Sequence, residues 1–579
     1  MDLDPEDFHP DKIKAQAEAE AQSAEPVPAL EPAKKLVPLD ELMATIGSRL
    51  VLGSLLFAGF LVGVWVGGVA LHDPDTCWLL ALGRYIVQTH SLPTQDPFSW
   101  TFAAQAADGQ RFVLYQWLSE VLFYLSTVPS GLFTLLLLCA VTISTAFLSI
   151  PMSFVVRREA PFVKSALVVI LGMVSASFHT LARPEIFSYL FMALYLQVVH
   201  HVRVSCLQGE KKLFPLVAVL APLMVLWANM HTGFITGFAI LGALSLGALL
   251  ALILFKAPVK NLLFSALTAL VVCAGAVLLN PYGMGLYAYI PQLFNMPSNK
   301  YIIELQPVLG PQLQTTPDLI PFLLLCCLYL FCMAREGMAF VRPMQAFTPE
   351  RQLLACELLI CLLTGEIGIW NALAHRRVAS FVTLVLVAEV IALLSLRKMR
   401  LQTPLPAQNP IKTKNRFWTL LDNHSLDLWK AGGIFEMAII ALCALAGVAL
   451  VAFRIAKPEL PASSVVFKAP FAAVEYIAKN QPAGKLYNDQ QFGDLLVYYL
   501  PGRPKVFVDT RFDMYGERLV RDYRTIHECE PGWQKLLVDY QVDWVFLDPD
   551  SLLAEQLLKD SSWKTLYKDD ASLILDHKK

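Results

Sequence analysis

Long apolar stretches recur along most of this chain, and they constrain its fold more than any other feature. A helix needs roughly 20 predominantly apolar residues to span a bilayer. Stretches of this kind occur near 50–71, 130–154, 163–181, 186–202, 213–228, 234–255, 261–279, 317–334, 352–371, 378–396 and 432–453. Hydrophobic residues make up 56% of the chain, which is outside the range of ordinary soluble proteins. We therefore expect a polytopic α-helical membrane protein with about eleven membrane-spanning helices.

The basic residues of the connections indicate the orientation of these helices. Most of the Lys and Arg residues lie in the loops that follow the even-numbered stretches, including the basic segment from Arg397 to Lys430. Cytoplasmic loops retain positive charge, whereas translocated loops are poor in it. The N-terminus is therefore expected in the cytoplasm. Because the number of stretches is odd, the C-terminus is expected on the outer side.

Two segments differ in composition from the membrane domain expected over residues 46–456. Residues 1–45 are acidic and rich in Ala and Pro, without apolar periodicity, which predicts a disordered cytoplasmic tail. Residues 457–579 contain three runs with the pattern of short buried strands, KLYNDQ, KVFVDT and VDWVFLD, with helical stretches near 468–479, 491–499, 515–528, 532–540 and 551–558. This alternation predicts a C-terminal extracytoplasmic α/β domain. A net charge of −2 argues against a nucleic-acid partner.

Polar and charged residues gather at the ends of the apolar stretches on the outer side. These are Asp73 and Asp75, Arg183 and Glu185, Asn229 and His231, Tyr282, and His375, Arg376 and Arg377. Ionisable groups at a membrane edge are costly and usually mark a function. Because five separate turns place such groups on one side, we expect one site at the outer membrane surface.

The first outer loop, residues 72–129, is the most structured of the expected connections. Residues 76–89 have apolar positions at helical spacing and few charges, as in a helix that lies in the membrane interface. Pro93 and Pro97 interrupt this pattern. A second surface helix is expected to begin near Tyr115 and to carry Glu120, which we include among the candidate substrate-binding residues.

These motifs resemble the GT-C glycosyltransferases, a superfamily that includes protein O-mannosyltransferases, oligosaccharyltransferase catalytic subunits and lipid A aminoarabinose transferases. The resemblance rests on an acidic motif after the first span, two surface helices in the first outer loop and a C-terminal extracytoplasmic domain. The segments DPDTCW, LPTQDPFSW, YQWLSE, LARPEIFSYLF, WANMHTGF and LNPYG also resemble a bacterial group of mostly uncharacterised GT-C-like membrane proteins. Two residues depart from the pattern of that group: Cys77 replaces an aromatic residue and Leu79 replaces a histidine.

The resemblance implies an enzyme of the bacterial inner membrane that transfers a sugar from a polyprenyl-phosphate carrier to a glycan, lipid or protein acceptor. The departing phosphate is already an anion, so the main chemical need is a base that activates the acceptor hydroxyl. Asp73 or Asp75 is the candidate base. Arg183, Arg376 and Arg377 are candidates for the lipid phosphate, because Arg binds phosphate through charge-assisted hydrogen bonds. Glu185, Asn229, His231, Tyr282 and His375 would complete the substrate pocket.

Each candidate also has a purely structural interpretation. The two aspartates are residues that favour helix N-caps, and Arg183 and Glu185 are close enough in sequence for a local ion pair. Arg376 and Arg377 are placed where long cationic side chains reach lipid headgroups, and His231 has the setting of a buried core histidine. No metal motif is present, and no cofactor is expected. A divalent Mg²⁺ or Mn²⁺ ion on the aspartates is a lesser alternative, by analogy with the oligosaccharyltransferases.

Two other functional classes stay open. A transporter or flippase of a lipid-linked substrate would also place charges within its helices, although such sites usually lie near the bilayer midplane and at internal repeats. A catalytically inactive GT-C-like scaffold of envelope assembly is the third reading, because Leu79 stands where the related group has a histidine.

Overall fold

The computed structural model describes residues 73–102, 112–156, 162–207, 214–296, 299–300, 302–309, 319–341, 348–402 and 468–578. The expected N-terminal tail and the expected first and last spans lie outside these residues. The long helices that are described are α6 (Leu132–Val156), α7 (Phe162–Ala176), α8 (Glu185–Leu207), α9 (Phe214–Met230), α10 (Phe234–Phe255), α11 (Lys260–Val277), α13 (Ile320–Val341), α14 (Pro349–Ala374) and α15 (Arg376–Gln402). Each of them falls on one of the apolar stretches predicted from the sequence.

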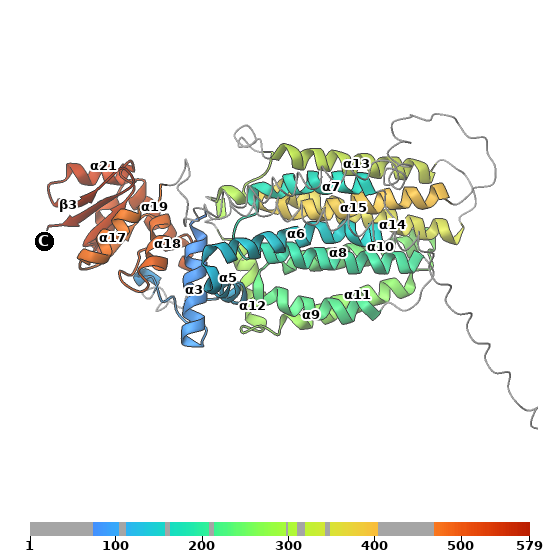
Figure 1. Ribbon diagram of the computed structural model, residues 1–579, viewed down its shortest axis with the longest axis horizontal. Coiled ribbons are helices and arrows are strands. Elements are labelled where there is room, and N and C mark those ends of the chain that lie inside the picture. The colour runs from blue at the N-terminus through green and yellow to red at the C-terminus, as the bar shows by residue number, and fades with distance from the viewer. Residues whose placement is uncertain are drawn as a thin grey trace, which may run out of the picture. The chain divides into compact units, whose positions relative to one another are not determined.

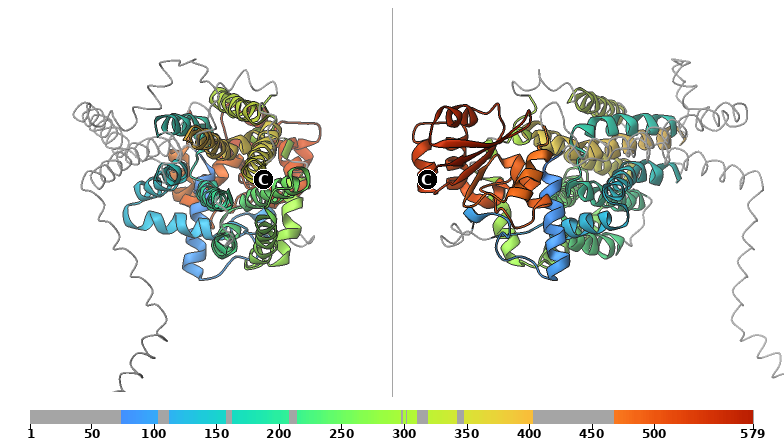
Figure 2. Two further views of the ribbon diagram at one scale, coloured as in Figure 1. Left: turned by 90° about the vertical axis from the view of Figure 1, so that its right-hand side faces the viewer. Right: turned by 60° about the vertical axis from the view of Figure 1, so that its left-hand side comes forward.

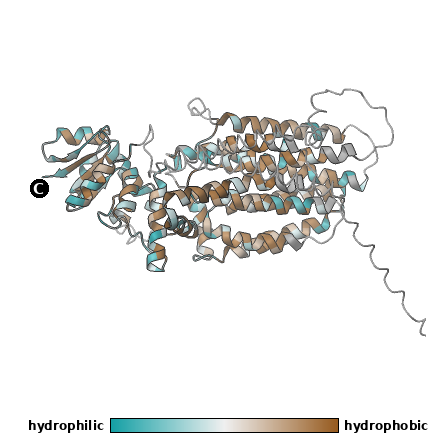
Figure 3. Cartoon of the chain, viewed as in Figure 1, coloured by the Kyte–Doolittle hydropathy of each residue, from teal (hydrophilic) through white to brown (hydrophobic). Residues whose placement is uncertain are grey.

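Within the described part of the chain, six helices are long and apolar enough to cross a membrane: α6, α10, α11, α13, α14 and α15. The apolar segments Leu167–His179 and Leu216–Met230, in α7 and α9, are shorter. These helices run side by side (Figure 1), and most residues along them are hydrophobic (Figure 3). The prediction of a polytopic helical membrane protein is therefore confirmed.

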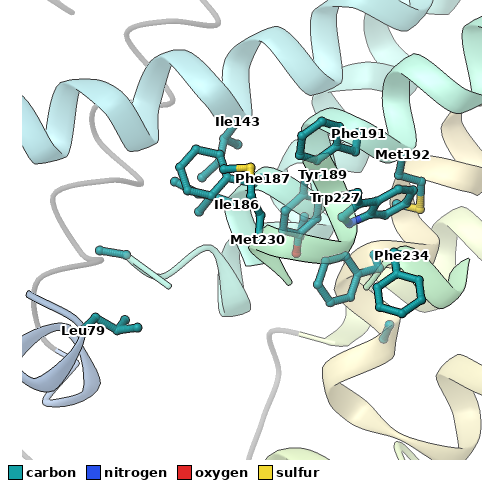
Figure 4. Packing of buried hydrophobic residues seen from close by; sticks show 14 of the residues in the cluster. Leu79, Ile143, Ile186, Phe187, Tyr189, Phe191, Met192, Trp227, Met230 and Phe234 are labelled. Atoms are coloured by element: carbon teal, nitrogen blue, oxygen red, sulfur yellow. The ribbon is translucent and has the colours of Figure 1, made fainter. Parts of the chain in front are cut away.

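Aromatic side chains fill the centre of the helix bundle. Trp227 of α9 stacks on Phe191 of α8, with ring centroids 5.8 Å apart, and meets Tyr195 edge-on at 5.4 Å. Tyr189 stacks on Phe381 of α15 at 4.7 Å. Figure 4 shows Tyr189, Phe191 and Trp227 gathered in this part of the bundle. Close packing of this kind holds α8, α9 and α15 in fixed relative positions.

One buried ion cluster lies inside the bundle. Arg203 of α8 bonds to Glu357 of α14, with an Nη2–Oε1 distance of 2.7 Å, and to Glu389 of α15, with an Nη1–Oε1 distance of 3.0 Å. All three side chains are almost completely buried. Such a cluster persists in a low-dielectric interior only when its charges are paired, as they are here. Its role is therefore to join three helices.

The first outer loop forms two helices, as predicted, which are α3 (Asp75–Thr89) and α5 (Trp117–Ser130). Helix α3 runs across the direction of the long helices (Figure 1). The two helices cross at Gly83, where an added Cβ atom would lie 2.0 Å from the backbone oxygen of Glu120. Only glycine permits this approach, and it brings the start of α5 against α3.

The C-terminal domain has the α/β organisation that the sequence predicts. Its elements are α17 (Phe471–Asn480), β1 (Leu486–Asn488), α18 (Gln490–Tyr499), α19 (Phe512–His527), α20 (Trp533–Asp539), β2 (Trp544–Leu547), α21 (Leu552–Lys559), β3 (Trp563–Lys568) and β4 (Leu573–His577). The strand order is β1-β2-β4-β3, with β1 parallel to β2 and the other pairs antiparallel. The sheet and its helices are seen in Figure 2. The hairpin of β3 and β4 was not predicted.

The run KVFVDT, predicted as a strand, does not join this sheet. The Asn488 side chain occupies the place of a neighbouring strand, because it accepts a hydrogen bond from the Phe507 N–H at 2.8 Å and donates one to the Val508 carbonyl at 2.8 Å. On its other side, Val506 forms an isolated parallel bridge with Ser99 of the first outer loop. The segment therefore connects the C-terminal domain to that loop.

Candidate functional site

Asp73 and Asp75 lie at the beginning of α3, on either side of Pro74. Pro74 occupies the N-cap, and the Asp73 carboxylate accepts a hydrogen bond from the Asp75 N–H at 3.3 Å. A proline at a helix start costs no backbone hydrogen bond, and the helix dipole favours carboxylates there. The turn around the proline brings the two carboxylates together, although two residues so close in sequence cannot share one face of a helix.

Arg183, in the turn before α8, connects the two aspartates to a third acid. Its Nη2 atom lies 3.0 Å from Asp73 Oδ1 and 3.0 Å from Asp75 Oδ2, and its Nε atom also bonds to Asp73. Its Nη1 atom lies 3.3 Å from Glu304 Oε2, in the short 3-10 helix η5 (Ile303–Leu305). One guanidinium group with five N–H donors can satisfy this geometry, because Nη2 has two N–H groups for its two acceptors and Nε and Nη1 each face one.

The charged cluster continues from Glu304 towards α15. His179, at the end of the 3-10 helix η3 (Ser177–His179), has its Nδ1 atom 3.9 Å from Glu304 Oε1 and its Nε2 atom 3.1 Å from Glu185 Oε2. The other oxygen of Glu185 contacts Arg377, at the start of α15. The structure thus brings together Asp73, Asp75, Arg183, Glu185 and Arg377, as the sequence predicts, and adds His179 and Glu304.

The C-terminal domain supplies one further contact to the acidic pair. The Thr510 hydroxyl lies 2.5 Å from Asp75 Oδ1 and 3.1 Å from Asp494 Oδ1. A hydroxyl has one proton to donate, and the shorter contact is with Asp75. Asp494 is fully buried in α18, and burial raises its pKa well above the usual range of an aspartate. The Thr510 hydroxyl therefore lies between the Asp75 carboxylate and Asp494, whose raised pKa favours the protonated carboxyl.

A buried ion pair fixes the segment that carries Thr510. Arg511 bonds to Asp509, with an Nη2–Oδ2 distance of 2.5 Å, and to Asp96 of the first outer loop, with an Nη1–Oδ1 distance of 2.7 Å. Asp509 and Arg511 both belong to the run VDTRFD. The contact with Asp96 crosses between the outer loop and the C-terminal domain, and all three side chains are at most 5% exposed.

Two tyrosines hold the next acidic residue of the same segment. Tyr115, before α5, and Tyr289, in α12 (Met284–Phe294), both approach Asp513 Oδ2, at 3.5 Å and 3.4 Å. Burial raises the pKa of Asp513, against the opposing effect of Arg511. Thr510 and Asp513 are therefore both in contact with elements of the membrane domain.

Asp73 and Asp75 differ in exposure and therefore in chemical role. The Asp73 side chain is 5% exposed and Asp75 is 19% exposed. Burial raises the pKa of Asp73 to about 6, although the Arg183 guanidinium opposes this rise. Both carboxylates bond to Arg183, and Asp75 is the more exposed of the two.

Three of the remaining predicted residues lie outside this charged cluster and bond to neighbouring elements. Asn229 accepts a hydrogen bond from the Trp117 indole at 2.9 Å and donates to the Leu279 carbonyl. His231 Nδ1 lies 2.8 Å from the Ser188 hydroxyl, and the Tyr282 hydroxyl accepts from the Leu114 N–H. These contacts fix the turns around the site. They leave substrate binding by these residues as a prediction.

Three other predicted residues have separate environments. His375 Nδ1 lies 3.1 Å from the Leu305 carbonyl, next to Glu304. Arg376 stacks on Phe178, with its guanidinium carbon 5.7 Å from the ring centroid. Glu120 is completely buried in α5, and burial raises its pKa to about 8. Arg376 and His375 therefore border the cluster, whereas the Glu120 carboxyl is enclosed.

The carboxylates of the cluster do not fit a divalent metal ion. Arg183 occupies the position between Asp73, Asp75 and Glu304, where a bridging ion would have to bind. In the described ranges, no group of three or more His, Cys, Asp or Glu residues has the arrangement of a metal site. The guanidinium group supplies the positive charge that these acids require.

Comparison with known proteins finds a likeness in fold but none in sequence. No protein-family model matches the chain, and no curated protein matches its sequence. The fold is similar to the crystal structure of ArnT from Cupriavidus metallidurans bound to undecaprenyl phosphate. The likeness covers 90% of this chain and 97% of that one, at 13% sequence identity and a TM-score of 0.44. At this level of similarity, any functional argument has to come from the residues of the site.

Proposed function

We propose that this protein is a membrane glycosyltransferase of GT-C type that takes its sugar from a polyprenyl-phosphate carrier. The observation that carries the proposal is the joining of Asp75, Arg183 and Arg377 in one cluster at the ends of apolar helices. A carboxylate next to guanidinium groups is what activation of a hydroxyl beside a lipid phosphate requires.

Asp75 is the proposed base. Its Oδ2 atom pairs with Arg183 and its Oδ1 atom accepts from Thr510, which fixes the orientation of the carboxylate. Each carboxylate oxygen has a second lone pair, so an acceptor hydroxyl can still donate to Asp75. As the hydroxyl oxygen attacks the anomeric carbon, its proton passes to Asp75 and the bond to the carrier phosphate breaks.

Arg376 and Arg377 are the proposed phosphate-binding residues. They open α15, where the helix N-terminus adds a partial positive charge. Arg377 is 31% exposed and contacts Glu185 through one nitrogen, so its other donors can meet phosphate oxygens. Arg376, held against Phe178, lies beside it. This arrangement would stabilise the polyprenyl phosphate as it leaves.

The location and the acceptor complete the proposal. Charge distribution in the loops supports a multi-pass protein of the bacterial inner membrane, with a cytoplasmic N-terminus and a periplasmic C-terminal domain. The reaction would then occur at the outer face, on a glycan, lipid or protein acceptor. The apolar helices provide contact with membrane lipids and with the prenyl chain.

The test is sugar transfer in membrane vesicles supplied with a labelled pool of polyprenyl-phosphate sugars. The double variant Asp73→Asn/Asp75→Asn keeps the shape of both side chains but removes their basicity. General-base catalysis contributes about 10²–10⁴-fold, so transfer should fall by that factor at equal folded yield. Full transfer by the double variant would reject the enzymatic proposal in favour of an inactive scaffold.

A further inference from the structure

A groove in the C-terminal domain has the side chains of a ligand-binding site and lies apart from the charged cluster. Its volume is about 550 Å³, within the range of small-molecule sites. Its walls come from α20, from β3 and β4, and from the residues next to β1 and β2. Two indole rings line it, Trp533 of α20 and Trp563 of β3.

The aromatic residues provide flat apolar surfaces within a polar rim. Trp533 and Trp563 are both only partly buried, so each ring keeps an accessible face. The Trp563 ring meets the His577 ring edge-on, with centroids 5.0 Å apart, and this contact fixes its orientation. Large, rigid aromatic side chains bind partners with little loss of conformational entropy.

The polar residues of the groove can both donate and accept hydrogen bonds. Gln534 and Gln541 carry amides with two donors and an acceptor each. Asp560 and Asp543 place carboxylates at the same walls. Lys485 Nζ donates a hydrogen bond to Gln541 Oε1 at 3.0 Å. The carboxylates and the engaged lysine disfavour an anionic ligand such as a nucleotide or a free phosphate.

We propose that this groove binds a carbohydrate chain. A pyranose ring presents an apolar face of C–H groups, which suits the indole rings, and a rim of hydroxyl groups, which suits amides and carboxylates. The ligand class that combines both features without a negative charge is a neutral or amino sugar. Binding here can be measured without sugar transfer, so either proposal can fail without the other.

The groove is connected to the segment that reaches the charged cluster. Lys485 Nζ lies 5.0 Å from the centroid of the Trp100 ring, in the first outer loop. The backbone N–H of Trp100 donates to the Val506 carbonyl at 3.1 Å. Thr510, four residues after Val506, contacts Asp75. A glycan in the groove would therefore be held next to the loop that contacts the proposed active site, as an acceptor or product chain requires.

The test is direct binding of defined oligosaccharides to the full-length protein in detergent, by isothermal titration calorimetry. The probes are chitotetraose, cellotetraose and mannotetraose, with tetragalacturonate as the anionic control. At least one neutral or amino-sugar probe should bind, and tetragalacturonate should not. Trp533→Ala and Trp563→Ala should each weaken binding about tenfold, the loss expected for about 1.4 kcal/mol of stacking.

Matched variants separate a binding role from a loss of fold. Leu552→Ala removes an exposed apolar side chain of the same domain, outside the groove, and should leave binding unchanged. Gln534→Ala changes a polar wall on an exposed helix face and should weaken binding without lowering the melting temperature. Failure of every neutral and amino-sugar probe to bind, or equal binding by wild type and both Trp variants, would overturn the proposal.

Discussion

At the residue scale, the aspartates of the DPD motif are distinguished by their surroundings. Asp73 is buried against Arg183, whereas Asp75 is more exposed and accepts a hydrogen bond from Thr510. The sequence places both acids at the membrane edge together with Arg183, since charged residues at the ends of apolar stretches are conspicuous. It does not reveal which acid is exposed, because that depends on how α3 packs.

Burial of Asp73 predicts a pH dependence of transfer. Its pKa is raised from 3.8 to about 6, so the carboxyl takes up a proton as the pH falls through 6. The protonated form pairs poorly with Arg183, and Arg183 then loses a contact that orients it towards Asp75. Transfer by the wild type should rise with pH up to about 6 and then level off. This rise of the transfer rate with pH should be absent in the single variant Asp73→Asn, whose residual rate is measured over the same pH range.

Thr510 is expected to position Asp75. Thr510→Val keeps the shape of the side chain and removes the hydroxyl, whose hydrogen bond is worth roughly 1.5–3 kcal/mol to a charged acceptor. We expect turnover to fall about tenfold or more while binding of the donor lipid is unchanged. Thr510→Ser, which keeps the hydroxyl, should restore turnover. Equal loss in both variants would contradict a role for the hydroxyl.

Other residues of the site could not be predicted from the sequence. His179 and Glu304 complete the cluster through contacts across the ends of separate helices. Thr510 reaches Asp75 across 435 positions of the chain. The adjacent segment SFHTLARPE offers one local signal, because a histidine stands four residues before Arg183. Glu304 and Thr510 offer none.

At the scale of elements, helices are predictable because apolar periodicity and length identify them directly. The strands β1 and β2 follow from short apolar runs. KVFVDT has the same composition but is not a sheet strand, since the Asn488 side chain bonds to its backbone instead. The hairpin of β3 and β4 was missed because WKTLYK carries three polar residues, and its burial pattern has three exposed positions and no buried one.

The crossing of α3 and α5 at Gly83 predicts a specific loss of stability. Gly83→Ala would place a methyl group 2.0 Å from the backbone oxygen of Glu120, which cannot move independently of α5. Overpacking of this kind costs about 1–3 kcal/mol, so the melting temperature in detergent should fall. Gly242→Ala in α10 is the matched control, because no atom lies within 4 Å of the added carbon. An unchanged melting temperature of Gly83→Ala would show that the helices separate readily.

At the scale of the whole molecule, the C-terminal domain and the first outer loop are joined by buried charges. Asp96→Ala would remove one of the two carboxylates that bond to Arg511 and leave Asp509 as the remaining one of the pair. Breaking a buried pair costs about 3–5 kcal/mol, so the variant should expose the 98–101 and 506–510 segments to proteolysis. Glu555→Ala, which breaks the exposed pair with Lys559, should have little effect on stability and leave cleavage unchanged. Resistance of the Asp96 variant to protease would contradict this docking.

The central claim is that Asp75 performs chemistry beside a lipid phosphate, and one measurement tests it most directly. Purified protein in liposomes that contain a synthetic polyprenyl-phosphate sugar is assayed for bound donor and for release of free polyprenyl phosphate in the same sample. We predict that Asp75→Asn binds as much donor as the wild type but releases polyprenyl phosphate more slowly, by a factor of about 10² at least. Release at the wild-type rate by Asp75→Asn, with donor bound, would contradict the account.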